Sequence, residues 1–150
     1  MERRLAAILA TDMVGYSRLM EADEVGIITR QKSHRRELID PEILRNRGKI
    51  IKTTGDGLLV EFASAVDAVR AAIDIQTGMK KREIESPEDE RIRYRVGINV
   101  GDIVFDDGDI YGDGVNVASR LECMAEPGGV CVSEYTHAMV QDGLSEPFND

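Results

Sequence analysis

The chain has 150 residues, 42% of them hydrophobic and 5% aromatic. This length and composition predict one domain with a buried core rather than two domains. Its 28 acidic residues outnumber 19 basic ones, and the formal charge of -9 argues against a general nucleic-acid binder, because such surfaces are basic. No apolar run approaches the roughly 20 residues that span a bilayer, and Asp12 comes too early for a signal sequence. Cys123 and Cys131 have neither metal-ligand nor disulfide spacing. They predict reduced thiols in a cytoplasmic protein without membrane contact.

The first half of the chain predicts a strand, a helix and a hairpin. Residues 3–13 contain a nearly continuous apolar run, which predicts a strand covered on both faces, with Asp12 at its carboxyl end. Apolar residues on one face predict a helix over residues 24–46, with a kink at Pro41. The segments KIIKTT and LLVEF flank a Gly-Asp-Gly turn, which is typical of a β-hairpin and presents Asp56 at its tip.

The second half predicts helices and strands in alternation. The expected elements are a helix capped by Ser64 over 64–79, a surface loop over 80–91, a strand over 93–104, a polar turn over 106–109, a helix over 114–124, a strand over 130–132 and a short helix capped by Ser133. Asn116 and Arg120 are four residues apart and project from one helical face. The order of elements predicts an α+β fold, a ferredoxin-like βαββαβ core with an additional strand and helices.

Asp12 and Asp56 each fall where a predicted strand stops, and together they predict a two-metal nucleotide site. Carboxylates at strand ends offer the hard oxygen ligands that Mg²⁺ demands, with water or phosphate oxygens in its other positions. Two carboxylates directed at one point repel each other unless cations lie between them. Asp-Gly turns are common, so Asp56 by itself would also fit an ordinary turn. The expected chemistry is phosphoryl or nucleotidyl transfer.

Four blocks in order resemble the catalytic domain of the class III nucleotidyl cyclases, the adenylate and guanylate cyclase family. The blocks are ILATDMVGYSRLM, IKTTGDGLLVEF, RVGINVGDIV and DIYGDGVNVASRLE. The resemblance covers nearly the whole chain and implies a single cyclase catalytic domain over residues 1–150 with the class III cyclase fold. It also implies a reaction at two Mg²⁺ or Mn²⁺ ions. In that reaction the ribose 3′ oxygen of ATP attacks the α-phosphate, which releases pyrophosphate and closes 3′,5′-cyclic AMP.

The resemblance assigns metal-binding and base-reading roles to individual residues. Asp12, Asp56 and the backbone carbonyl of Met13 would hold both metal ions. Lys52 and Asp109 match the positions that read the base. A lysine can only donate, which suits N1 of adenine, and an ionised aspartate can only accept, which suits the N6 amino group. Guanine reverses this pattern, and family members that use GTP typically have an acidic residue and a small or thiol residue here. The pair therefore predicts ATP.

Asn116 and Arg120 match the transition-state residues of the family. The asparagine would orient the ribose, and the arginine would meet charge that develops on phosphate, with a fixed fork of donors. Outside this motif, Arg120 would simply pair with Glu122 or Glu126 on its own helix. In the family the metal aspartates come from one subunit and the other site residues from its partner. The resemblance therefore implies a homodimer with two shared sites and an inactive monomer.

The resemblance also leaves expectations and alternatives open. Members of the family continue into a strand whose lysine contacts the triphosphate, so a chain ending at Asp150 predicts a domain without its C-terminal end and with reduced turnover. The alternatives are a noncatalytic nucleotide-binding regulatory module, a guanylate cyclase, and another two-metal enzyme such as a polymerase palm or a diguanylate cyclase. A diguanylate cyclase would carry a different hairpin turn. His34 and His137 lack partners at ligand spacing, so packing or surface roles are expected.

Overall fold

The structure is a computed structural model that describes residues 1–141. The expectation about the C-terminal end of the domain concerns residues 142–150 and beyond, which lie outside the described residues. The elements are β1 (Glu2–Met13), α1 (Tyr16–Ala22), α2 (Glu24–His34), the π-helical η1 (Arg35–Ile39), α3 (Asp40–Arg45), β2 (Lys49–Thr53), β3 (Leu58–Phe62), α4 (Ala65–Arg82), the short 3₁₀ helix η2 (Glu88–Glu90), β4 (Tyr94–Asp106), β5 (Asp109–Tyr111), α5 (Asp113–Met124), β6 (Val130–Val132) and α6 (Glu134–Val140). Among these helices, none combines the length and the apolar character that crossing a bilayer requires.

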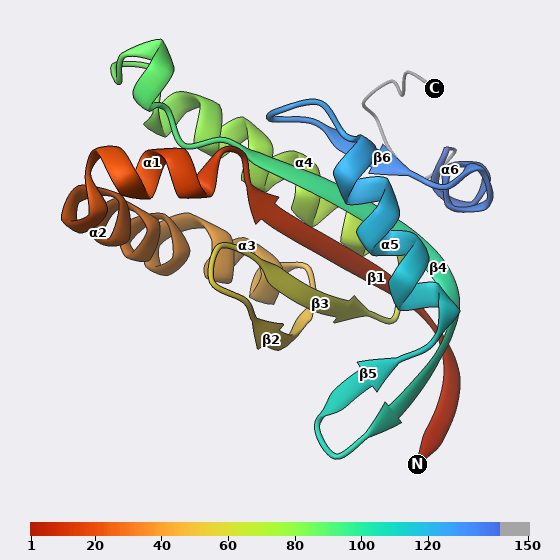
Figure 1. Cartoon of the computed structure of the whole chain (residues 1–150). Coiled ribbons are helices and arrows are strands. Elements are labelled where there is room, and N and C mark those ends of the chain that lie inside the picture. Colours follow the sequence, from red (N-terminus) through yellow and green to blue (C-terminus); the bar gives the residue numbers. More distant parts are fainter. Residues whose placement is uncertain (142–150) are drawn as a thin grey trace.

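The strands form one sheet in the order β2-β3-β1-β4-β5, with β6 parallel to β4 (Figure 1). Strands β2, β3, β1 and β4 are antiparallel neighbours, and helices connect β1 to β2 and β3 to β4. This is the predicted ferredoxin-like βαββαβ core, with β5, α5, β6 and α6 as additions. The predicted α+β fold is confirmed.

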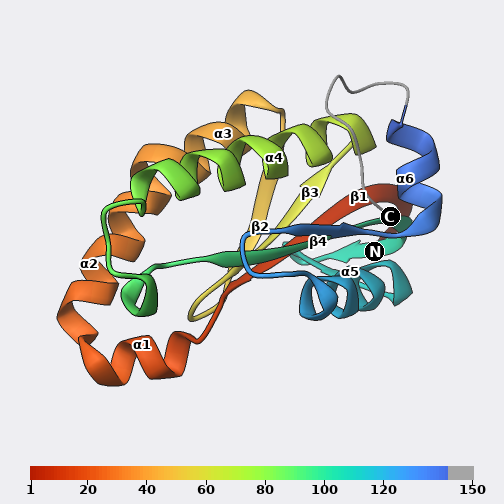
Figure 2. The same cartoon turned by 90° about the horizontal axis from the view of Figure 1, so that it is seen from above.

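Helices cover both faces of the sheet, with α2 to α4 on one side and α5 on the other (Figure 2). Alternate residues of β1 face the two layers because side chains alternate along a strand. Ala7 and Leu9 belong to the apolar cluster beneath α2 to α4, whereas Ile8 and Ala10 belong to the cluster beneath α5. The burial of β1 on both faces is confirmed. By the same alternation, Asp12 points to the α5 side.

The long helical segment after α1 contains a π-helical turn one turn before Pro41. The Asp40 amide donates to the Arg35 carbonyl, five residues back. The irregularity expected at Pro41 is thus absorbed by a wider helical turn. His34, at the end of α2, is 5% exposed, and its Nε2 lies 2.7 Å from Glu83 Oε2. His34 therefore has the packing role expected for it, between α2 and α4.

The structure differs from the sequence-based elements in three places. The segment expected to be a loop from residue 80 continues α4 to Arg82, because Arg82 bonds to Nδ1 of His34 at 2.8 Å and to Glu37 at 2.8 Å. Helix α1 was not predicted, since it buries only Leu19 and shows no apolar stripe. Strand β5 was not predicted either, because the turn at residues 106–109 connects a strand pair only three residues long.

Candidate active site

The structure brings Asp12 and Asp56 together at the end of β1. Asp56 lies in the β2–β3 turn, which is closed by a hydrogen bond from the Thr54 amide to the Gly57 carbonyl at 2.9 Å. A Cβ atom on Gly57 would lie 1.8 Å from the Thr11 carbonyl oxygen, so only glycine lets the turn pack this closely against β1. Burial, and then the charge of Asp12, raise the pKa of the Asp56 carboxyl group. Bound cations would relieve this repulsion between the Asp12 and Asp56 carboxylates.

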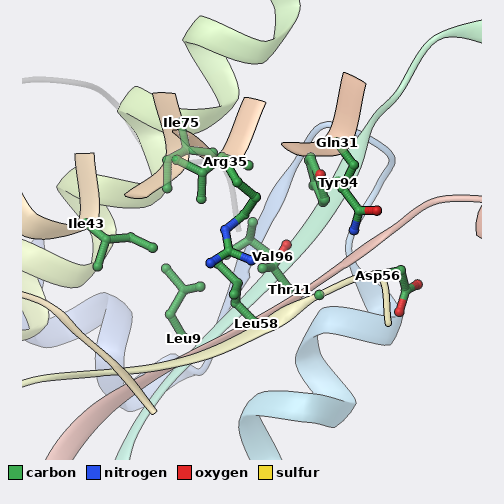
Figure 3. A pocket seen from close by; sticks show the side chains of 12 residues that line it. Leu9, Thr11, Gln31, Arg35, Ile43, Asp56, Leu58, Ile75, Tyr94 and Val96 are labelled. Carbon is green, nitrogen blue, oxygen red and sulfur yellow. The ribbon is translucent and has the colours of Figure 1, made fainter. Parts of the chain in front are cut away.

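A narrow cavity lies behind the Asp56 turn, between the sheet and the helical segment of α2, η1 and α3 (Figure 3). Most of its lining is apolar, from Leu9, Ile39, Ile43, Leu58, Ile75 and Val96. Gln31 fastens the turn from the helix side, since its Nε2 donates to the Gly55 carbonyl at 3.2 Å. The Tyr94 hydroxyl is buried without a hydrogen-bond partner in the described part of the chain, and burial raises its pKa. The side of the Asp56 turn that faces the helices is therefore covered by side chains rather than by solvent. This agrees with burial as the main cause of the raised Asp56 pKa.

Arg95 lies opposite Asp12 in the register of β1 and β4. Its Nη2 is 3.6 Å from Asp12 Oδ1, which makes an ion pair but is too long for a hydrogen bond. Asp12 Oδ1 and Arg95 Nε are both buried, and neither has a hydrogen-bond partner among residues 1–141. Such atoms are uncommon in folded proteins, so the pair has hydrogen-bonding capacity that residues 1–141 leave unused.

Glu122 places a third carboxylate beside Asp12. It lies on the inner face of α5 and is 5% exposed. A Cβ atom on Gly97 of β4 would lie 2.2 Å from the Glu122 amide nitrogen, so α5 packs directly on the sheet. Burial, together with the neighbouring Asp12, raises the pKa of Glu122 to about 7. Glu122 belongs to the same electrostatic group as the predicted metal ligands.

Replacing Glu122 with glutamine is expected to stabilise the metal-free protein at about pH 8 and much less at about pH 5. Between 4.5, the ordinary pKa of glutamate, and about 7, the folded state holds a proton that the unfolded chain has released. Stability is therefore lost as the pH rises through this window, by roughly 3 kcal/mol at most. The measurement is the difference in Tm between the variant and the wild-type protein at both pH values, with a chelator present. An equal difference in Tm at the two pH values would contradict the raised pKa of Glu122.

Lys52 and Asp109 form an ion pair although β2 and β5 lie at opposite ends of the strand order. Lys52 Nζ is 3.1 Å from Asp109 Oδ2, and Asp109 Oδ1 accepts from the Ile110 amide at 2.7 Å. The Ile110 amide, and then Lys52, lower the pKa of Asp109, which keeps it an acceptor at neutral pH. The hairpin of β4 and β5 projects beyond the body of the sheet (Figure 1) and brings Asp109 to Lys52.

A β-bulge in β2 gives Lys52 its direction. Ile50 pairs with Val60 and Lys52 pairs with Leu59, so Ile51 is an extra residue in the strand. Leu59 belongs to the apolar cluster on the α5 side of the sheet, whereas Val60 belongs to the cluster beneath α2 to α4. Without the extra residue, alternation would point Lys52 to the same side as Ile50, away from the β4–β5 hairpin.

Asn116 and Arg120 project from the face of α5 that points away from the sheet. Ala118, between them, is fully buried on the inner face, and both predicted site residues are exposed. The Arg120 side chain is 69% exposed and forms a long ion pair with Asp113, at 3.9 Å, rather than with the acidic residues that follow it. The two side chains therefore face away from Asp12 of their own chain, which lies on the inner side of α5.

The residues around Asp12 fit the metal ions that the resemblance implies. Asp12 and Asp56 offer carboxylate oxygens, and a hydrogen bond from the backbone amide of Met13 lowers the pKa of Asp56 against the effect of burial. Within residues 1–141, no group of three or more histidine, cysteine, aspartate or glutamate side chains is arranged to hold a metal ion. Two carboxylates would therefore need further oxygen ligands from the backbone and from a phosphate. That donor set suits Mg²⁺, which commonly binds one or two carboxylates together with substrate phosphates.

The structure thus groups the predicted residues into three sets: Asp12, Met13 and Asp56; Lys52 and Asp109; Asn116 and Arg120. Sequence reasoning missed two neighbours of the first set, Arg95 and Glu122. Arg95 lies within the RVGINVGDIV block, directly before its Val-Gly-Ile. Glu122 lies four residues after Ala118, on the helical face opposite Asn116 and Arg120. Both could have been found from the pairing of β1 with β4 and from the helical period.

The chain folds as a ferredoxin-like core with helices on both faces of the sheet, and Asp12 and Asp56 meet at the end of β1. The family model described as "Adenylate and Guanylate cyclase catalytic domain" matches residues 3–149. The chain belongs to this family, and the resemblance seen in the sequence is confirmed.

Similar proteins carry cyclase names. The chain is 49% identical over 148 residues to "Putative adenylate cyclase 3" of Rhizobium meliloti, covering 99% of the chain and 25% of that protein. It is 34% identical over 135 residues to an adenylate cyclase of Streptomyces coelicolor, covering 87% of the chain and 32% of that protein. The crystal structure of an adenylate/guanylate cyclase/hydrolase from Silicibacter pomeroyi matches with a TM-score of 0.92 and 59% identity, over 100% of the chain and 87% of that structure. The chain thus spans about a quarter to a third of these curated relatives.

Proposed function

We propose that residues 1–150 form one catalytic domain of an adenylate cyclase, which converts ATP to 3′,5′-cyclic AMP and pyrophosphate at sites shared by two copies of the chain. The proposal goes beyond family membership in naming ATP, the metal ions and the dimer. It places the reaction in the cytoplasm, in keeping with two free cysteines. The contact between Lys52 and Asp109 is the observation that carries the choice of ATP.

Asp12 and Asp56, with the Met13 carbonyl, would hold two Mg²⁺ or Mn²⁺ ions. When bound, these ions would lower the pKa of the ribose 3′ hydroxyl and neutralise charge on the phosphates. The chain's own contribution is to hold two carboxylates close together in spite of their repulsion. Gly57 and Gln31 do this by fixing the Asp56 turn against β1. Arg95, whose Nη2 lies 3.6 Å from Asp12 Oδ1, adds a positive charge beside these carboxylates.

Lys52 and Asp109 would read the edge of adenine. N1 and the exocyclic N6 amino group of adenine are both bonded to C6, so a donor and an acceptor that lie 3.1 Å apart are placed to meet both. The lowered pKa of Asp109 keeps its carboxylate ionised and able to accept from the amino group. Guanine presents a proton at N1 and an oxygen at position 6, which would leave both side chains mismatched.

A second copy of the chain is proposed because Asn116 and Arg120 face away from the Asp12 and Asp56 of their own chain. In a two-fold symmetric dimer, these exposed side chains would complete the site of the partner. Asn116 would orient the ribose, and Arg120 would bind the phosphate charge that develops during attack. Each site would then take its metal ligands from one copy and its transition-state residues from the other.

The proposal is tested by measuring cyclic AMP and cyclic GMP formation with Mn²⁺ over a range of protein concentrations. The 150-residue chain is compared with a longer chain that continues past Asp150. Cyclic AMP that rises faster than linearly with protein concentration is the expected result. Metal-dependent ATP binding without any cyclic product, in both chains, would favour the noncatalytic regulatory module. Predominant cyclic GMP would instead favour a guanylate cyclase.

Mixing two inactive variants is expected to restore activity. Asp56→Ala removes a metal ligand and Arg120→Ala removes a transition-state group, so neither homodimer would contain an intact site. In a mixed dimer, one site would combine both defects and the other would have neither. The readout is cyclic AMP formation by the mixture, expected at up to roughly a quarter of the wild-type rate on statistical mixing into symmetric dimers. A mixture no more active than its components would argue against shared sites.

A further inference from the structure

Glu83 is a buried carboxylate that the proposed reaction does not use. It is the C-cap residue of α4 and is 4% exposed. Its Oε2 lies 2.7 Å from His34 Nε2, and its Oε1 accepts from the Ile92 amide at 2.8 Å and from Arg30 Nη2. Burial raises the pKa of Glu83, but these hydrogen bonds and the charge of Arg30 outweigh burial and lower it. Glu83 is therefore ionised at neutral pH and joins α2, α4 and the segment that leads into β4.

Arg30 and His34 hold Glu83 from one face of α2. They are four residues apart, so their side chains lie on the same face, one helical turn from each other. Arg82 of α4 fixes the orientation of the imidazole ring, since its Nε donates to His34 Nδ1 at 2.8 Å. Because arginine can only donate, Nδ1 is the acceptor, and Nε2 carries the proton that His34 donates to Glu83. Arg30, His34 and Glu83 together form the α2 clamp.

The helical segment is irregular directly after the α2 clamp. The π-helical η1 begins at Arg35, the residue after His34, and regular α-helix resumes at Asp40. A π-helical turn bonds over five residues rather than four, which interrupts the regular hydrogen bonding between α2 and α3. The position of α2 therefore depends on its own tertiary contacts more than on continuity with α3. The α2 clamp supplies contacts of this kind that are both buried and charged.

Gln31 lies within the clamped turn of α2 and reaches the candidate metal site. It follows Arg30 directly and precedes His34 by three residues. Its side chain extends from α2 toward the Asp56 turn (Figure 3), and its Nε2 donates to the Gly55 carbonyl at 3.2 Å. A shift of α2 by about 1 Å would lengthen this contact beyond the range of a hydrogen bond. The Asp56 turn would then lose its support on the helix side.

We propose that Glu83 is a positioning residue for the candidate metal site. The α2 clamp fixes α2, and Gln31 then holds the Asp56 turn against β1. The proposal rests on the proposed function, in which Asp56 binds metal. It makes the placement of that ligand depend on a buried carboxylate at the C-terminal end of α4. A displacement of about 1 Å in a reacting group can lower an enzymatic rate by roughly 100-fold, so a remote clamp of this kind affects turnover.

The test removes each half of the α2 clamp and asks whether the effect passes through Gln31. His34→Phe keeps a ring and removes both of its hydrogen bonds. Arg30→Met removes the guanidinium group from a side chain that is 31% exposed, and it serves alone where His34→Phe does not fold. Each variant is made by itself and together with Gln31→Ala. His34→Gln is the rescue variant, because its amide can still donate to the carboxylate.

Thr29→Val is the matched control on the same helix. It removes an exposed hydroxyl that donates to the Val25 carbonyl within α2 and does not touch the clamp. Hydrogen–deuterium exchange is measured in metal-free protein, in peptides that contain the Asp56 turn and in peptides from α5 and α6. Mn²⁺ affinity is measured from the electron paramagnetic resonance signal of the free ion. The rate of cyclic AMP formation is measured with saturating Mn²⁺.

His34→Phe and Arg30→Met are each expected to speed exchange in the Asp56 turn several-fold, to weaken Mn²⁺ binding and to lower the rate by about tenfold or more. Exchange in α5 and α6 should not change. Gln31→Ala should have the same effects, and combining it with either clamp variant should add nothing, because both changes act through one hydrogen bond. His34→Gln and Thr29→Val should behave as the wild-type protein does.

Three results would overturn the proposal. The first is wild-type exchange in the Asp56 turn of the clamp variants. The second is a combined effect that multiplies with that of Gln31→Ala, because the clamp would then act by another route. The third is an equal increase of exchange in the Asp56 turn, α5 and α6, which would reflect a general loss of stability.

Failure of the proposed function has a different result. A wild-type chain that forms no cyclic nucleotide, but whose Asp56 turn exchanges faster in the clamp variants, would retain the positioning role and lose the cyclase activity. A wild-type chain that forms cyclic AMP, but whose Asp56 turn does not respond to the clamp, would retain the activity and lose the positioning role.

Discussion

Replacing Asp56 with asparagine is expected to lower the rate of cyclic AMP formation by at least about 100-fold, as the loss of a group that stabilises transition-state charge does in other enzymes. Asparagine fills the same space in the β2–β3 turn but offers a neutral oxygen, so the two metal ions would lose a shared charged ligand. The turn itself should remain intact, because Thr54, Gly57 and Gln31 hold it and asparagine can still accept backbone hydrogen bonds. The measurement is the rate with Mn²⁺, together with the Mn²⁺ affinity of the variant.

A matched control for Asp56→Asn is Asp107→Asn in the turn of β4 and β5. Asp107 is exposed and has a φ angle of 54°, a conformation that asparagine also adopts. The control should keep wild-type Mn²⁺ affinity and rate. Asp56→Asn should also melt at a temperature no lower than the wild-type protein in the absence of metal, because the repulsion from Asp12 is removed. Full activity in Asp56→Asn would refute the metal assignment.

The double variant Lys52→Glu with Asp109→Cys is expected to reverse the preference from ATP to GTP. A glutamate can accept from the N1 and amino protons of guanine, whereas it faces the N1 acceptor of adenine without a proton to share. Each mismatched hydrogen bond to a charged group costs about 1.5–3 kcal/mol, so the two losses should lower kcat/KM for ATP by roughly 100-fold or more. Both positions must change together, because Lys52→Glu alone would place two carboxylates where an ion pair now lies.

Specificity is measured as kcat/KM for ATP and for GTP in the double variant and in Lys49→Glu. Lys49 is exposed on the same strand and undergoes the same change of charge, but its ammonium group lies over the Phe105 ring rather than beside Asp109. The control should retain the preference of the wild-type protein. An unchanged preference in the double variant would show that Lys52 and Asp109 do not read the base.

The sequence was sufficient to predict those parts of the fold that depend on local pattern. The apolar run of β1, the Gly-Asp-Gly turn and the caps at Ser64 and Ser133 each correspond to an element of the structure. These features depend on neighbouring residues, so the periodicity and turn chemistry of a single segment reveal them. The roles of the candidate residues came from the resemblance of four sequence blocks to a family. In the structure, these residues lie in three local groups.

The remainder of the site depends on contacts between distant segments. Glu122 is one of several glutamates in its region, and only the packing of α5 on Gly97 shows that it faces Asp12. Arg95 resembles the other arginines of its segment until the pairing of β1 with β4 places it opposite Asp12. No local pattern encodes these relations.

The extra residue at Ile51 makes the length of β2 as important as its composition. Lys52 reaches Asp109 only because one inserted residue changes the side of the sheet to which the strand's later side chains point. Two relatives whose β2 strands differ by a single deletion would present different side chains to the hairpin, even with otherwise identical residues. In such proteins, the loss of one codon would change which nucleotide is preferred. A comparison that counts only substitutions would not detect this change.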